Sequence, residues 1–262
     1  MSQSASFLGA WLVSEYVYAP SGEYVGQVRQ RRILQPQGET IRVIQHCAPV
    51  EPAETLSAET QKVIEIMNAR IGEYVFELKM SGKARRYLGP DVLGGGFSWM
   101  EGVLTARGIW PRFGYNFTSF SILLTPRRQV TGGRFFIANQ EAAVIVGAAT
   151  PEDEGFPTLE PLALQDAQGQ MFILSPNGNL LKTLPIRAAD LAFKEIPPLT
   201  GRVQRYGALR EIETVSAPGE TLSWLEVSDA QNGMAAGLRK RICDEKLHSV
   251  EVYFLNQPAP TP

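Results

Sequence analysis

Hydrophobic and polar residues alternate along most of this chain, and such a period of two is typical of β-strands that bury one face. In the N-terminal part the pattern predicts strands over 11–18, 24–34 and 40–47. The turn signals Pro20-Ser21-Gly22 and Pro36-Gln37-Gly38 separate these strands. Consecutive strands joined by such short turns predict an antiparallel meander.

One segment leaves this pattern and follows the helical period of 3.6 instead. Residues 58–71 place their large apolar side chains on one helical face, namely Val63, Ile64, Met67 and Ile71. Ser57 is suited to cap the start of this helix, and Gly72 is suited to end it. We predict one helix over 58–71 that packs as a lid over one end of the sheet, in preference to a helix that binds a partner.

The alternation resumes after the predicted helix and continues almost to the C-terminus. It predicts strands over 73–79, 84–88, 100–110, 115–125, 129–138, 171–174, 180–184, 202–214, 221–227, 237–243 and 249–255. Residues 142–148 suit either a strand or a short helix, and residues 89–96 are predicted to form a glycine-rich loop. Asn177-Gly178, between two of the late strands, is a strong hairpin signal.

Antiparallel strands in this number favour closure, because a closed sheet has no unpaired edge. We therefore predict a mostly β protein: an antiparallel up-and-down β-barrel with one lid helix and extra C-terminal strands. Residues 1–150 would form the barrel core, and residues 151–262 would supply strands that complete or extend the barrel. The polar segment 150–158, which contains two prolines, is the expected seam.

Charge and hydropathy exclude several classes of function. The 262 residues carry a net charge of -2, so the chain lacks the basic surplus of a dedicated nucleic-acid binder. No apolar run approaches the length of about 18 residues that a membrane-spanning helix needs. The N-terminal residues lack the pattern of a secretory signal. We expect a cytoplasmic protein with no nucleic-acid partner and no membrane span, and the sequence leaves a homodimer open.

The chain has only two cysteines, Cys47 and Cys243, and two histidines, His46 and His248. In a reducing compartment the two thiols are expected to be free. His46 and Cys47 are neighbours on one strand and point to opposite faces, so they cannot bind the same metal ion without distortion. We expect no metal site and no cofactor, since the sequence also lacks a redox-cofactor motif.

Gly9-Ala10-Trp11, at the start of the first predicted strand, resembles the Gly-x-Trp opening of the calycin superfamily, which includes lipocalins and fatty-acid-binding proteins. The resemblance implies an up-and-down barrel in which Trp11 closes the bottom, stacked by an arginine from a late strand. Arg239 and Arg241 are the candidates for that arginine. The tripeptide pattern returns at Gly108-Ile109-Trp110, at the end of another predicted strand.

Arginine dominates the basic residues, with 18 Arg against 7 Lys. A guanidinium group tolerates partial burial and binds carboxylate or phosphate through paired hydrogen bonds. Several predicted strands carry arginine, and an arginine inside a barrel needs a partner. That partner is either an acidic side chain (Glu15, Glu77 or Glu101) or an anionic ligand. We select Arg31 and Arg107 as candidate ligand-binding residues.

The segment 108–120 combines aromatic residues with arginine and asparagine around a Pro-x-x-Gly turn. Aromatic walls with a few polar groups suit a flat organic ligand. We select Trp110, Asn116 and Phe117 from this segment as further ligand-binding candidates. The alternative is a hydrophobic core with one polar turn.

These observations predict a β-barrel protein that binds a small, largely apolar, anionic organic ligand, in a pocket of about 300 Å³ or more. The alternative is a cofactor-independent lyase, isomerase or decarboxylase that acts on an aromatic or isoprenoid carboxylate in the same pocket. In that case Glu101, Tyr115 and His46 are the candidate catalytic residues, as proton carriers. The sequence does not decide whether the protein is an enzyme.

Overall fold

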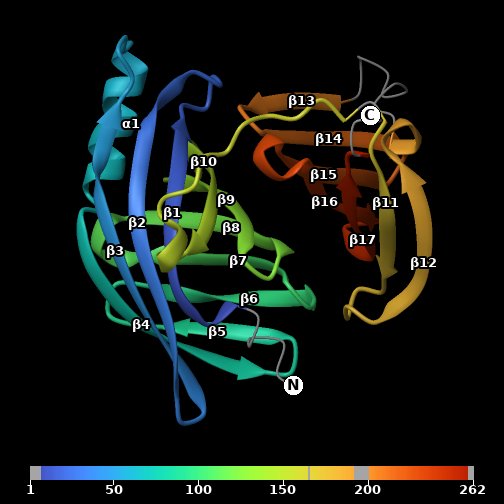
Figure 1. Cartoon of the computed structure of the whole chain (residues 1–262), viewed down its shortest axis with the longest axis horizontal. Helices are drawn as coiled ribbons and strands as arrows, with labels where there is room; N and C mark the ends of the chain where they lie inside the picture. Colours follow the sequence, from blue (N-terminus) through green and yellow to red (C-terminus); the bar gives the residue numbers. More distant parts are fainter. Residues whose placement is uncertain (1–6, 165, 192–200, 259–262) are drawn as a thin grey trace. The chain divides into compact units, whose positions relative to one another are not determined.

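The computed structural model describes residues 7–164, 166–191 and 201–258. The chain divides into two compact units, Met1–Thr158 and Leu159–Pro262 (Figure 1). The N-terminal segment 1–6, on which the expectation of no secretory signal depends in part, lies outside the described residues.

Ten strands of the N-terminal unit form a closed antiparallel barrel (Figure 1). They are β1 (Gly9–Tyr18), β2 (Tyr24–Gln37), β3 (Thr40–Pro52), β4 (Gly72–Ser81), β5 (Ala84–Leu88), β6 (Leu93–Met100), β7 (Val103–Trp110), β8 (Tyr115–Thr125), β9 (Arg128–Ile137) and β10 (Gln140–Pro151). Each strand pairs with the next along the chain, and β10 returns to pair with β1. The predicted up-and-down barrel is confirmed, together with one helix and extra C-terminal strands.

The structure corrects the sequence prediction for one segment of the barrel and decides between the two alternatives for another. The glycine-rich segment 89–96 was predicted as a loop, but Leu93 already begins β6. Its glycines serve close packing of backbones, because a Cβ on Gly94 would lie 2.4 Å from the carbonyl oxygen of Arg107 on β7. Residues 142–148, for which strand and helix were both open, belong to strand β10.

The helix α1 (Ala58–Asn68) closes one end of the barrel. Ser57 caps its start by accepting a hydrogen bond from the Thr60 backbone N–H at 3.2 Å. The helix ends three residues earlier than predicted, and Ile71 is exposed between the helix and β4. The Tyr115 hydroxyl donates to the Ile66 carbonyl at 2.7 Å, and the Val50 backbone N–H donates to Asn68 Oδ1 at 2.9 Å. These bonds fasten the lid to β8 and β3.

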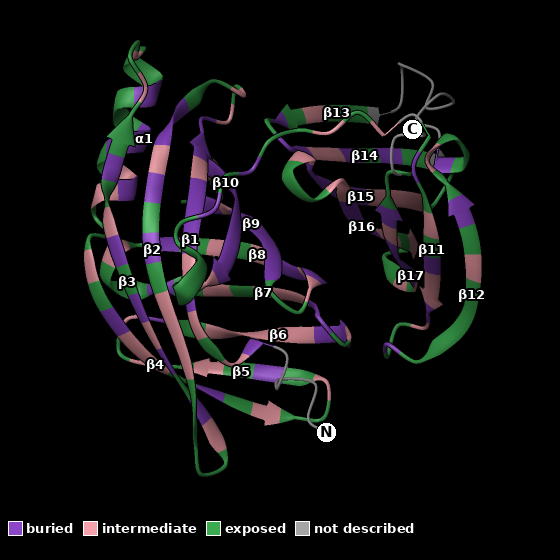
Figure 2. Cartoon of the chain, in the orientation of Figure 1, coloured by how far each residue is buried: buried purple, intermediate pink, exposed green. Residues whose placement is uncertain are grey.

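Buried and more exposed residues alternate along strands such as β2 and β3, which gives these strands their banded pattern in Figure 2, whereas β9 and β10 are buried along most of their length. On β1 the inward set includes Trp11 and Glu15. Residues that lie opposite each other on paired strands point to the same side of the sheet. Trp11 lies opposite Arg32 on β2, and Arg32 lies opposite Gln45 on β3, so these side chains also point inward. The interior therefore contains polar and charged side chains among its aromatic and aliphatic ones.

The C-terminal unit is a seven-stranded antiparallel sheet of its own, in the order β12-β11-β17-β16-β15-β14-β13. Its strands are β11 (Gln168–Leu174), β12 (Leu180–Arg187), β13 (Gly201–Tyr206), β14 (Leu209–Ala217), β15 (Glu220–Asp229), β16 (Met234–Cys243) and β17 (Lys246–Asn256). The barrel closes without them. The segment 202–214, predicted as one strand, forms two, because Gly207 adopts a left-handed φ of 57° in a tight turn.

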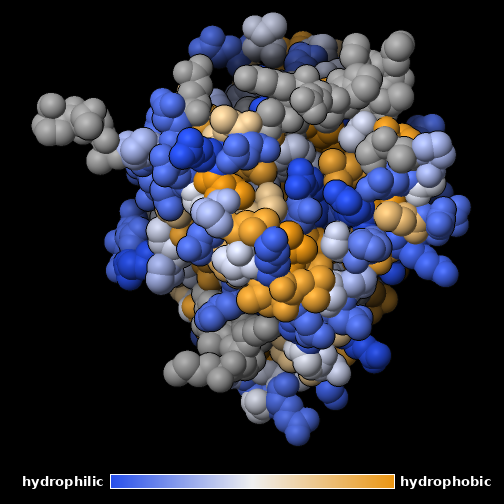
Figure 3. Space-filling model, turned by 90° about the vertical axis from the view of Figure 1, so that its right-hand side faces the viewer, coloured by the Kyte–Doolittle hydropathy of each residue, from blue (hydrophilic) through white to orange (hydrophobic). Residues whose placement is uncertain are grey.

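Two leucines at the start of the edge strand β12, Leu180 and Leu181, are exposed. Figure 3 views the molecule from the side on which β12 lies in Figure 1, and it shows hydrophobic side chains gathered between hydrophilic ones. A homodimer stays a prediction.

The arginine expected to stack on Trp11 is not found there. The Arg239 guanidinium lies 5.3 Å from the ring centroid of Trp224, and Arg241 forms an ion pair with Glu220 at 3.2 Å. Both arginines belong to the sheet of the C-terminal unit. Trp11 is buried inside the barrel, and its indole N–H donates to the Phe7 carbonyl at 3.1 Å.

Candidate functional site

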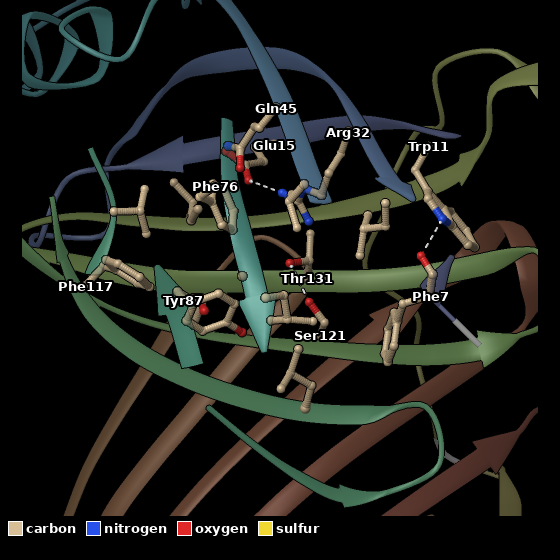
Figure 4. Close-up of a pocket in the computed structure, with 18 of the residues that line it drawn as sticks. Phe7, Trp11, Glu15, Arg32, Gln45, Phe76, Tyr87, Phe117, Ser121 and Thr131 are labelled. Atoms are coloured by element: carbon tan, nitrogen blue, oxygen red, sulfur yellow. Dashed lines mark hydrogen bonds and ion pairs between the residues drawn. The ribbon is translucent and has the colours of Figure 1, made fainter. Parts of the chain in front are cut away.

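The barrel encloses a cavity of about 160 Å³ between the lid helix and the strand ends near Trp11. Its apolar wall is largely aromatic, with Phe7, Trp11, Phe76, Tyr87, Trp110, Phe117 and Phe135. Its polar wall includes four charged residues, namely Glu15, Arg32, Arg70 and Arg85. Figure 4 shows Glu15, Arg32 and Gln45 on one side of this space, across from Tyr87, Ser121 and Thr131. An aromatic cavity with a few converging polar groups is the usual form of a small-molecule site.

Glu15 is the acidic member of a buried cluster, with 2% of its surface exposed. Its carboxylate accepts a hydrogen bond from Gln30, lies 3.3 Å from Arg70 Nη2 and lies 3.8 Å from Arg32 Nη2. The Gln30 side-chain carbonyl accepts hydrogen bonds from Gln45 at 3.0 Å and from Arg32 at 3.2 Å. The buried Glu15 carboxylate is therefore compensated from three sides.

Arg70 reaches this cluster from the chain just beyond the lid helix. Its guanidinium carbon lies 4.9 Å from the ring centroid of Phe135, and its Nη1 lies 3.7 Å from the Met67 sulfur. Burial is the largest single influence and acts to lower the pKa of Arg70, but Glu15, Cys47 and Tyr115 together outweigh it and the pKa is raised above its usual value. Arg70 is thus a charged residue that is stably held inside the protein.

Arg85 differs from Arg70, because no carboxylate among the described residues pairs with it. Only 4% of its surface is exposed. Its Nε donates to Ser98 Oγ at 2.9 Å, and its guanidinium carbon lies 5.5 Å from the ring centroid of Phe7. Its Nη2 is buried without a hydrogen-bond partner. Burial lowers the pKa of Arg85, as expected for a cation without a counter-charge.

Two further donors lie near Arg85 in the cavity wall. Arg32 Nε is buried and has no partner in the described part of the chain. The Tyr87 hydroxyl also has no hydrogen-bond partner among the residues described. Burial raises the pKa of Tyr87, while the charges of Arg85 and Arg32 act to lower it, so both guanidinium groups lie within electrostatic range of this hydroxyl.

The charge of the cavity is positive. Three guanidinium groups and one carboxylate are found among its described lining residues, which leaves two positive charges uncompensated. A buried charge is expensive unless an opposite charge and hydrogen bonds accompany it. The arrangement therefore favours an anion in the cavity, near Arg85, Arg32 and Tyr87.

The structure places two of the predicted ligand-binding residues, Trp110 and Phe117, in this cavity. Arg107 and Asn116 are exposed and line a separate outer hollow of about 520 Å³, which Phe117 also reaches. Arg31 is exposed on the outside of β2, where its Nε donates to Glu152 at 2.6 Å. Water can satisfy these exposed groups, so the outer hollow lacks the buried, unpaired donors of the cavity.

None of the three predicted proton carriers faces the cavity. His46 is exposed on the outward face of β3, and Glu101 is exposed in the turn between β6 and β7. Tyr115 is buried, but its hydroxyl is engaged by the carbonyl of Ile66 in the lid helix. Desolvation on burial raises the pKa of Tyr115 to about 12.

Sequence reasoning missed Arg32, Arg70, Arg85 and Tyr87 as cavity residues, and considered Glu15 only as a partner for an arginine. One signal was present for Glu15, because it continues the inward series that contains Trp11 and the fully buried Val13. A charged residue at a position where the alternation of a strand predicts a buried hydrophobic one indicates a buried polar cluster.

The cavity is smaller than expected. A pocket for a drug-sized ligand measures about 300–1,000 Å³, whereas this cavity measures about 160 Å³. The expectation of about 300 Å³ or more is not met, and the cavity admits a ligand of about one ring. Among the described residues, no group of three or more His, Cys, Asp or Glu side chains is placed to hold a metal ion. No helix in the described ranges is long and apolar enough to cross a membrane.

No family model matches the sequence, and no curated protein matches it. Among solved structures, the chain is similar to a protein of unknown function from the DUF3598 family of Nostoc punctiforme, with a TM-score of 0.57, 12% sequence identity and coverage of 98% of both chains. This similarity indicates a shared fold over nearly the whole chain.

Two other solved structures match a smaller share of the chain. An S-type phycobiliprotein lyase from Guillardia theta has a TM-score of 0.39 and 9% identity, and covers 57% of this chain and 91% of its own. A redesigned β-barrel has a TM-score of 0.31 and 12% identity, and covers 58% of this chain and 97% of its own. TM-scores this low establish no shared fold.

Proposed function

We propose that this protein is a calycin-like binding protein whose barrel holds a small, largely apolar, anionic organic ligand. The observation that carries the proposal is Arg85, a buried cation in the cavity wall without a carboxylate partner among the described residues. A protein that only needed a stable barrel would gain from an apolar residue at this position, because an unpaired buried charge is destabilising. A bound anion supplies the missing charge.

A carboxylate suits the donors available. Its two oxygens offer about four acceptor positions, and the unpaired donors are Arg85 Nη2, Arg32 Nε and the Tyr87 hydroxyl. Arginine holds carboxylates through hydrogen bonds that are strengthened by charge. Glu15 repels an anion from the other part of the polar wall, so the cavity also orients the ligand.

A lyase, isomerase or decarboxylase is the second candidate, and it needs a proton carrier beside the bound anion. Tyr87 is the residue that favours it, since its hydroxyl faces the cavity near two arginines. Glu15 is a weaker candidate, because Gln30, Arg70 and Arg32 already surround its carboxylate. Binding without reaction requires no proton carrier, and we therefore place the binding protein first.

The test compares two arginine variants with benzoate as the probe, by isothermal titration calorimetry. We expect Arg85→Met to weaken benzoate binding by about 10- to 100-fold, because a hydrogen bond to a charged group contributes about 1.5–3 kcal/mol. Arg107→Met removes an exposed guanidinium from the outer hollow and should leave the affinity unchanged.

Equal losses in both variants would place the site outside the cavity. An absence of saturable binding to the unaltered protein would contradict the proposal. NMR spectra of benzoate and related carboxylates, recorded over time in the same samples, distinguish the binding protein from the enzyme. Only an enzyme converts its ligand into a product.

A further inference from the structure

A second polar surface lines the same cavity, on strands β8 and β9. It consists of uncharged residues, namely Ser119 and Ser121 on β8 and Gln129 and Thr131 on β9. Register places Ser121 directly opposite Thr131. In Figure 4 the side chains of Ser121 and Thr131 point into the space across from Arg32.

The hydrogen bonds of this surface leave acceptor oxygens free. The Thr131 hydroxyl donates its one hydrogen to the Phe120 carbonyl at 3.0 Å. In the 3.3 Å contact between the two hydroxyls, Ser121 must therefore be the donor to Thr131. The Ser121 oxygen keeps its lone pairs available toward the cavity.

Two neighbouring groups add both donors and acceptors. The Ser119 hydroxyl and the Gln129 side-chain amide have no hydrogen-bond partner within the described ranges, and both residues line the cavity. Gln129 is 5% exposed, so bulk water does not fully solvate it. Buried polar groups that lack a partner are destabilising until something pairs with them.

The two polar parts of the cavity therefore suit different groups of a ligand. The region of Arg85, Arg32 and Tyr87 is positive and rich in donors, which suits an anion. The β8–β9 surface is neutral and offers both donors and acceptors, which suits a hydroxyl group, because a hydroxyl donates one hydrogen bond and accepts others.

The volume and walls of the cavity limit the rest of the ligand. An apolar cavity of about 150 Å³ in another protein accommodates benzene, and this cavity of about 160 Å³ is lined by aromatic rings such as Phe76 and Phe117. A flat single ring therefore suits the available space.

We propose that the ligand is a hydroxylated monocyclic aromatic carboxylate, whose ring hydroxyl binds Ser119, Ser121 and Gln129. This inference rests on the proposed function and specifies the ligand class of the same site. It assigns the ring hydroxyl to the β8–β9 surface and the carboxylate to the arginines.

The experiment measures the affinities of benzoate, 2-, 3- and 4-hydroxybenzoate and phenol for the full chain by isothermal titration calorimetry. At least one hydroxybenzoate should bind about 3- to 10-fold more tightly than benzoate, as expected for one net hydrogen bond. Phenol, which lacks the carboxylate, should bind more weakly than that hydroxybenzoate.

Variants separate the two ends of the ligand. Ser121→Ala combined with Gln129→Met should remove the preference for the hydroxybenzoate while the affinity for benzoate stays within twofold. Arg85→Met should weaken both ligands. Circular dichroism verifies that each variant remains folded, and Ser119→Ala alone, the smallest change, provides a second test if the double variant unfolds.

If benzoate binds and no hydroxyl position improves the affinity, the inference on ligand class is overturned while the proposed function stands. If none of these carboxylates binds, the proposed function fails and the inference fails with it. Retention of the hydroxyl preference in the β8–β9 variants would also overturn the assignment of that surface.

Discussion

One buried charged group in the sheet and one in the barrel differ in how they are paired. In the C-terminal sheet, Glu226 accepts hydrogen bonds from Arg210 at 2.7 Å and from the Tyr253 hydroxyl at 2.5 Å, and Trp224 Nε1 donates to the same hydroxyl at 2.7 Å. In the barrel, Arg85 is equally buried, but no acidic group among the described residues faces it. Glu226 is thus paired within the sheet, whereas Arg85 in the barrel has no carboxylate partner among the described residues.

Packing in the sheet supports this pairing. Register places Tyr253 opposite Gly237, where a Cβ would lie 2.1 Å from the tyrosine ring. The missing side chain lets the ring lie flat and its hydroxyl reach Glu226. Desolvation and the Glu226 carboxylate raise the pKa of Tyr253 well above its usual value, so this hydroxyl stays protonated as a donor. A buried carboxylate that is paired in this way serves the fold, while a buried cation that lacks a carboxylate partner indicates a site.

The largest effect is expected from breaking the matched network. Glu226→Ala leaves Arg210 without its carboxylate and Tyr253 without its acceptor, and should lower the free energy of unfolding by about 3 kcal/mol. Differential scanning calorimetry measures the change. Glu213→Ala, at an exposed position on β14, is the control and should change stability by less than about 0.5 kcal/mol. Equal stability of the two variants would show that the network does not stabilise the sheet.

A smaller effect, of opposite sign, is expected in the barrel. Arg85→Met keeps much of the side-chain volume and removes an unpaired buried cation, so the ligand-free protein should become more stable by about 1–2 kcal/mol. Urea unfolding measures the gain, with Arg107→Met as the exposed control. A clear loss of stability in Arg85→Met would mean that Arg85 is structural, and the comparison between the units would no longer hold.

The smallest effect concerns the lid at high pH. The pKa of Tyr115 is raised to about 12 in the folded protein, so the unfolded chain loses this proton first as the pH rises. The contribution of Tyr115 to folding stability should therefore be fully present below pH 10 and be lost as the pH rises from 10 to 12. Tyr115→Phe removes this contribution and should flatten the fall, while costing about 1 kcal/mol at neutral pH through the lost bond to Ile66. Denaturant unfolding at several pH values tests both, and an unchanged slope would contradict the assignment.

The architecture of the barrel was predictable, because alternation and short turns are local features. Which face of each strand points inward was harder to predict. On β2, arginines occupy both faces, at Arg31 and Arg32, and local pattern does not choose between them. The choice depends on pairing with β1, which places Arg32 opposite Trp11 and turns it inward.

The site itself depended on long-range contacts that periodicity does not encode. Arg70 belongs to the segment predicted as helix, yet it enters the barrel and pairs with Glu15, 55 residues earlier in the chain. Arg85 and Tyr87 lie on a short strand, and its pairing with β4 decides which of its side chains point into the barrel. The expectation of an anionic ligand came from the number of arginines, and only the fold distinguishes buried arginines from exposed ones.

The position of Arg70 has a consequence for ligand exchange. Lifting the lid helix would draw Arg70 away from Glu15 and Phe135, which separates two buried ions and breaks the bond from Tyr115 to Ile66. We therefore expect that movement to be slow. At the other end of the barrel, Phe7 is held by its contact with Arg85 and by one hydrogen bond from Trp11. Entry and release of a ligand should therefore be faster past Phe7 than past the helix.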